Sequence, residues 1–125
     1  DRVGRDFILH YENLSNQDLN LLYNHASCLF FPSKYEGFGI PALEAQLAGC
    51  PVLYAETSSM PEVMAYKEMA YGDDDIDGAI EKLLFLETGN IRKELIAQGV
   101  DFAKKFSWRN MGEMTKELYR DIYNG

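Results

Sequence analysis

Two carboxylates stand close together in the segment of this sequence that carries the most chemistry. Glu36 lies in a loop with Gly37 and Gly39, and Glu44 lies in a helix predicted at 40–48. A carboxylate can accept two hydrogen bonds at once, so it matches the neighbouring hydroxyls of a sugar. Glycines let the backbone approach a ligand, and a helix N-terminus offers unpaired N–H groups and partial positive charge to a phosphate. A phosphate site between two carboxylates, each able to accept hydrogen bonds from neighbouring sugar hydroxyls, fits a nucleotide-diphosphate sugar.

The elements on both sides of this segment predict an α/β fold. The apolar runs 27–31 and 51–54 show no alternation, which is typical of strands buried on both faces of a parallel sheet. Shorter apolar runs at 7–9 and 69–71 are candidates for further strands. Helical spacing predicts helices at 16–25, 40–48 and 61–64, two within 76–106, and a last one at about 107–123. The expected caps are Ser15 for the first, Ser58 or Ser59 for the helix at 61–64, and Ser107 for the last. We therefore predict a Rossmann-like open parallel sheet flanked by helices, which binds ligands outside the carboxyl ends of its strands.

Length and charge limit the classes of protein to which this chain can belong. The 125 residues fit one domain, and the chain does not open with Met, so we interpret 1–125 as a single partial domain cut from a longer protein. Twenty acidic against twelve basic residues argue against general binding to nucleic acid or anionic lipid. No apolar run approaches the roughly 18 residues of a transmembrane segment. Cys28 and Cys50 lack partners at metal-ligand spacing, which favours reduced core thiols and a cytoplasmic location.

The stretch from Pro32 to Ala45 resembles the Glu-x7-Glu motif of the retaining "group 1" glycosyltransferases of the GT-B fold. Glu36 and Glu44 stand at that spacing within the setting Pro-Ser-x-x-Glu-Gly-Phe-Gly-x-Pro-x-Leu-Glu-Ala. Further segments resemble motifs of the same family in the same order, at 22–26, 48–52, 60–63 and 106–108. The resemblance covers most of the chain. It implies the larger part of a GT-B C-terminal domain, without its first strands and without the N-terminal, acceptor-binding domain.

The resemblance also implies a function and a role for each motif residue. The reaction is the transfer of a sugar, of the hexosyl type, from a nucleotide-diphosphate donor to a hydroxyl with retention of the anomeric configuration. Glu36 is the expected catalytic residue beside the donor sugar, Glu44 is expected to bind the ribose, and the backbone of Gly37, Phe38, Gly39 and Ile40 is expected to bind the sugar and diphosphate. The acceptor is a glycan, a lipid-linked sugar or a small molecule held by the missing domain. No cofactor or metal is implied, and the isolated chain is expected to be inactive because the family's basic diphosphate-binding residues have no match here.

Several alternatives stay open at this point. The acidic run 73–75 could hold a divalent cation on a nucleotide diphosphate, but we favour a solvated turn whose last residue, Asp75, caps the next helix. A non-catalytic nucleotide-sugar-binding or scaffold domain of the same fold would keep the motif without transferring sugar. A signalling receiver domain fits less well, because its phospho-acceptor Asp is replaced by Glu36 in the loop after the strand at 27–31. The location is expected to be cytoplasmic, with a peripheral position at the cytoplasmic membrane face left open for the full-length protein.

Overall fold

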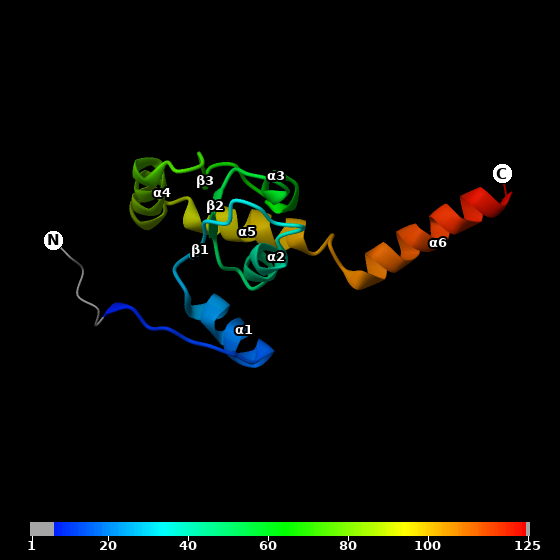
Figure 1. Ribbon diagram of the computed structural model, residues 1–125, viewed down its shortest axis with the longest axis horizontal. Helices are drawn as coiled ribbons and strands as arrows, with labels where there is room; N and C mark the ends of the chain where they lie inside the picture. The colour runs from blue at the N-terminus through cyan, green and yellow to red at the C-terminus, as the bar shows by residue number, and fades with distance from the viewer. Residues whose placement is uncertain (1–6, 125) are drawn as a thin grey trace.

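The computed structural model describes residues 7–124, which contain one three-stranded parallel sheet with helices around it (Figure 1). The strands are β1 (Leu29–Phe31), β2 (Val52–Ala55) and β3 (Ala70–Tyr71), and the helices are α1 (Asn16–His25), α2 (Ile40–Leu47), α3 (Met60–Val63), α4 (Ile76–Thr88), α5 (Arg92–Ala103) and α6 (Trp108–Asn124). The strand order is β1-β2-β3, with Phe30 opposite Leu53 and Tyr54 opposite Ala70. This architecture confirms the predicted Rossmann-like α/β class.

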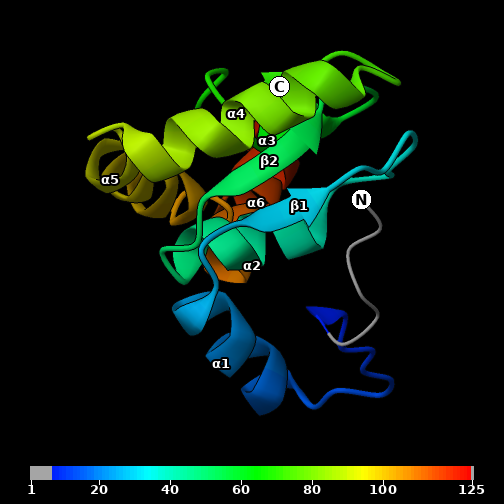
Figure 2. The ribbon, with the colours of Figure 1, turned by 90° about the vertical axis from the view of Figure 1, so that its left-hand side faces the viewer.

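The central strand β2 forms the middle of the core. All four of its residues are buried, as the uninterrupted apolar run predicted. Figure 2 shows α4 and α2 on opposite sides of the strands. The buried Gln46 of α2 joins three segments, because its amide nitrogen donates to the Val63 carbonyl at 2.9 Å and its oxygen accepts from the Ala65 N–H at 3.0 Å. A polar side chain in this core is therefore fully paired, which removes the cost of burying it.

Local capping explains where the predicted helices begin. The Ser15 hydroxyl accepts a hydrogen bond from the Asp18 N–H at 3.1 Å, and α1 has the predicted bounds. Asp75 accepts from the Gly78 N–H at 2.9 Å and caps α4, as expected for the last residue of the acidic run. The Ser107 hydroxyl accepts from the N–H of Asn110 at 3.1 Å, at the start of α6.

Two predictions about strands were wrong. Residues 7–9 form no strand, and the Phe7 side chain is 82% exposed, since no strand among residues 7–124 pairs with this segment. The second error concerns β1, which is not buried on both faces: Phe30 is 50% exposed. The physical reason is position, because β1 lies at the edge of the sheet while α4 packs on β2 and β3.

The last helix, α6, extends away from the rest of the domain (Figure 1). Its apolar residues Met111, Met114, Leu118 and Ile122 recur at helical spacing and are all more than half exposed. None of the helices described between residues 7 and 124 has the length and apolar character needed to cross a membrane.

Candidate functional site

The loop between β1 and α2 leaves the sheet at the carboxyl end of β1 and ends at Gly39. This residue has φ +82°, a left-handed conformation that glycine adopts at little cost. A Cβ at Gly39 would lie 3.1 Å from the Met60 sulfur and 3.1 Å from a Val63 methyl, both in buried side chains. Gly37 is exposed and has no heavy atom within 4 Å of such a Cβ. Only the second glycine of the motif is therefore required by the fold.

Backbone N–H groups at the start of α2 are available to a ligand. The N–H groups of Ala42 and Leu43 donate to the Gly39 carbonyl, at 3.1 and 3.3 Å, and Pro41 has no N–H. Within the described part of the chain, no carbonyl or side chain accepts a hydrogen bond from the N–H groups of Gly37, Phe38, Gly39 and Ile40. Gly39 is buried, whereas Gly37, Phe38 and Ile40 are exposed, so the N–H groups of these three residues, next to the positive end of the helix dipole, suit an anion.

Glu36 is half-buried in this loop and accepts three hydrogen bonds at two of its oxygen atoms. The Ser33 hydroxyl donates to its carboxylate Oε1 at 2.7 Å. Its backbone carbonyl accepts two hydrogen bonds, one from the Ser58 hydroxyl and one from the Ser59 hydroxyl, each at 3.0 Å. The sequence predicted that Ser58 or Ser59 caps the helix at 61–64, which was wrong, because neither hydroxyl caps α3 and both donate to Glu36. Their place after the carboxyl end of β2 indicated that they lie near the site, but not which group they bind.

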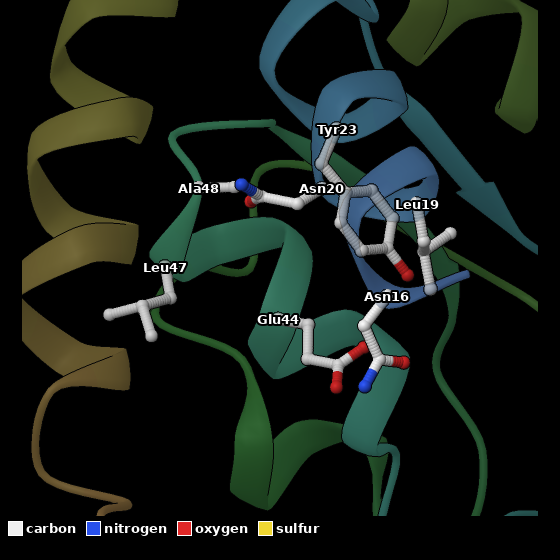
Figure 3. A pocket seen from close by; sticks show the side chains of 7 residues that line it. All are labelled: Asn16, Leu19, Asn20, Tyr23, Glu44, Leu47 and Ala48. Atoms are coloured by element: carbon white, nitrogen blue, oxygen red, sulfur yellow. The ribbon is translucent and has the colours of Figure 1, made fainter.

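Glu44 is exposed on α2 and lines a pocket of about 240 Å³ against α1. Figure 3 shows its carboxylate and the Asn16 amide pointing into the same opening. The other residues that line the pocket are Leu19, Asn20, Tyr23, Leu47 and Ala48. Burial, followed by the negative charge of Glu44, raises the pKa of the Tyr23 hydroxyl. The pocket thus combines a carboxylate, two amides and a neutral phenol, a set of groups suited to hydroxyls and heterocycles.

Three further side chains of the motif, those of Tyr35, Phe38 and Ile40, lie on the surface of the loop and helix. Phe38 is 44% exposed, and its ring meets the ring of Phe106 edge-on with 6.0 Å between centroids. Ile40 and Tyr35 are exposed. Through its contact with Phe106, Phe38 packs the loop between β1 and α2 against the segment between α5 and α6.

The acidic run after β3 is tied to the loop after β1. The Lys34 ammonium lies 2.7 Å from the Asp74 carboxylate and 3.3 Å from that of Asp73. The hydrogen bonds that the Lys34 ammonium donates, first to Asp74 and second to Asp73, raise the pKa of Lys34. The part of the chain that the structure describes contains no group of three or more His, Cys, Asp or Glu side chains placed to hold a metal ion.

Comparisons with known proteins identify the family. A family model described as "Glycosyl transferases group 1" matches residues 4–101, which is most of the chain. The chain belongs to the group 1 glycosyltransferases. It is 36% identical over 106 residues to the O-antigen chain mannosyltransferase B of Escherichia coli, covering 84% of this chain and 28% of that protein. It is 35% identical over 118 residues to the serotype-specific mannosyltransferase WbdA of Escherichia coli, covering 92% of this chain and 14% of that protein.

A third relative is named for a different activity. The D-inositol 3-phosphate glycosyltransferase of Streptomyces bingchenggensis is 28% identical over 128 residues, covering 99% of this chain and 28% of that protein. This group 1 chain therefore spans between 14% and 28% of the length of these relatives. No solved structure matches the chain.

Proposed function

We propose that this chain is the donor-binding, C-terminal part of a retaining GT-B glycosyltransferase. The observation that carries the proposal is the arrangement at the carboxyl end of β1. Four N–H groups without an acceptor among the described residues lie in chain order between Glu36 and the Glu44 pocket. Glu36 can accept hydrogen bonds from a sugar, the N–H groups can bind a diphosphate, and Glu44 can accept hydrogen bonds from a ribose. A nucleotide-diphosphate sugar presents these three groups in the same order.

Each part of the site then has one role. Glu36 is the catalytic residue, which binds the hydroxyls of the donor sugar and stabilises positive charge developing at the anomeric carbon. The backbone of the residues from Gly37 to Ile40 binds the sugar and diphosphate, and the charge of the leaving diphosphate is met by donors that are already oriented. Glu44 accepts hydrogen bonds from the ribose hydroxyls in the pocket beside α1. The sugar passes to a hydroxyl of the acceptor with retention of configuration.

The names of the relatives suggest the substrate class. Two of them are named mannosyltransferases, so a nucleotide-diphosphate mannose is the first donor to test. We propose that the rest of the full-length protein supplies the acceptor site, for a glycan, a lipid-linked sugar or a small molecule. The reaction is proposed to be metal-independent and cytoplasmic, and the 125-residue chain alone is expected to transfer no sugar.

A calorimetric titration of the full-length enzyme with GDP, UDP, ADP and their sugar conjugates, with and without Mg²⁺, tests the donor site. We expect one diphosphate family to bind independently of Mg²⁺, and Glu44→Ala to weaken that binding at least tenfold, because charge-assisted hydrogen bonds are lost. Glu81→Ala, the same change on an exposed part of α4, is the control and leaves the affinity unchanged. Binding that requires Mg²⁺, or none to any of these compounds, would contradict the proposal.

A second measurement tests catalysis. Glu36→Ala is expected to abolish sugar transfer while the nucleoside diphosphate still binds, since the contacts of Glu44 and the backbone remain. A Glu36→Ala enzyme that keeps its biological role would instead support the non-catalytic scaffold alternative.

A further inference from the structure

Three hydroxyls that follow β2 reach across to the loop that carries Glu36. The Thr57 hydroxyl donates to the Ser33 carbonyl at 3.0 Å. The Ser58 and Ser59 hydroxyls both donate to the Glu36 carbonyl at 3.0 Å. A carbonyl oxygen has two lone pairs, so the two serines satisfy this one completely. We call Ser58 and Ser59 the serine clamp.

The local conformation of the clamp is unusual for serines at the start of a helix. Ser59 is the N-cap residue of α3, yet its hydroxyl caps no N–H of its own helix and turns to Glu36 instead. Ser58 has φ +52°, a left-handed conformation that costs a residue with a Cβ more than it costs glycine. The Ser59 side chain thus forgoes a cap, and the Ser58 backbone adopts a costly conformation, while both hydroxyls make the same contact with a loop more than twenty positions away.

Planarity of the peptide bond gives this contact a consequence for the site. The Glu36 carbonyl and the Gly37 N–H belong to one rigid peptide unit and point in opposite directions. Gly37 is exposed, without a neighbour within 4 Å of a Cβ position, and glycine is the residue that most readily allows such a unit to rotate. When the serine clamp holds the Glu36 carbonyl, the Gly37 N–H therefore points away from the clamp. On that side no described residue accepts a hydrogen bond from it.

We propose that Ser58 and Ser59 are positioning residues for the donor site. They fix the peptide between Glu36 and Gly37, and so orient the catalytic carboxylate and the first N–H donor before the nucleotide sugar binds. Two further hydroxyls complete the arrangement. The Ser33 hydroxyl donates to the Glu36 carboxylate, and the Thr57 hydroxyl donates to the Ser33 carbonyl. This inference rests on the proposed function, and its structural part can be tested without a ligand.

The test compares the full-length enzyme with the Ser58→Gly/Ser59→Ala variant, which removes both hydroxyls and relieves the left-handed backbone at 58. We expect trypsin to cleave the native protein after the exposed Lys34 about tenfold faster, because losing two ordinary hydrogen bonds lets the loop open more often, while cleavage after Lys82 of α4 stays unchanged. The affinity for GDP-mannose, or for UDP-glucose if the titration above selects uridine, should fall by about the same factor. Ser59→Thr keeps a hydroxyl and is expected to preserve both values. Thr88→Val is the control, because it removes a hydroxyl-to-carbonyl hydrogen bond of 2.7 Å near the end of α4.

A double-mutant cycle with Glu36→Gln separates positioning from general support of the fold. If the clamp acts through Glu36, its removal should weaken binding of the same nucleotide sugar much less in the Glu36→Gln enzyme than in the wild type. Fully additive effects, or an unchanged rate of cleavage after Lys34, would overturn the inference. Faster cleavage after Lys82 as well would overturn it too, because that result indicates a structural role only. If the wild type binds no nucleotide sugar at all, the proposed function fails, and the rate of cleavage after Lys34 alone decides whether the clamp holds the loop.

Discussion

Replacing Gly39 with alanine is the sharpest single test of how the site is built. Gly39 turns the chain from the Glu36 loop into α2 with φ +82°. Its Cα faces α3, where an added Cβ would come within 3.1 Å of both Met60 and Val63. These two side chains are 0% and 1% exposed, so neither can move aside into solvent.

The magnitude follows from two separate costs. Holding an alanine in the left-handed region costs roughly 1–2 kcal/mol. Forcing a methyl group against a close-packed core costs typically about 1–3 kcal/mol more. We therefore expect Gly39→Ala to lower the free energy of unfolding by about 2–5 kcal/mol, a large share of the roughly 5–15 kcal/mol of a typical domain.

Equilibrium urea unfolding of the chain, followed by circular dichroism, measures this difference. The midpoint should fall by about 1 M or more with an unchanged slope, because a domain of this size has a slope of roughly 1–3 kcal/mol/M. Gly37→Ala is the matched control in the same motif. Since Gly37 has open space around it and no left-handed φ, its replacement should change stability by less than about 0.5 kcal/mol. Equal effects of the two substitutions would refute the reasoning.

Three further predictions concern the core. Gln46→Leu should destabilise the chain by about 2–4 kcal/mol in the same assay, because it leaves a buried carbonyl and a buried N–H unpaired; a loss below about 1 kcal/mol would contradict this. Burial raises the pKa of Tyr54 to about 12 from the ordinary 10.0, so its contribution to stability is complete below pH 10 and is lost as the pH rises toward 12. Thermal unfolding across pH 9–12 should show a steeper alkaline loss in the wild type than in Tyr54→Phe, and parallel profiles would argue against it. Burial raises the pKa of Cys28 to about 11 and also raises that of Cys50, so a thiol-specific reagent at pH 8 should label neither residue rapidly until urea unfolds the chain.

The positions of most elements could be predicted because the forces that set them are local. The Ser15 cap and the start of α1 depend on residues within four positions of each other, and so does the Asp75 cap of α4. The uninterrupted apolar run at 51–54 predicted a buried strand, and β2 is buried along its whole length. The motif from Glu36 to Glu44 was recognised from residue types and spacing alone.

What surrounds the motif residues was decided by tertiary structure. The sequence determined that this chain belongs to an α/β class, with a loop that carries Glu36 and two glycines before a helix, because periodicity and capping depend on residues close together in the chain. It could not indicate that Ser58 and Ser59 hold the Glu36 carbonyl, or that Glu44 shares a pocket with α1. Nor could it distinguish the exposed edge of β1 from the buried centre of the sheet. Burial and hydrogen bonding between loops depend on which distant segments pack together. The apolar pattern of a strand is the same whether or not a helix or another strand covers it in the fold.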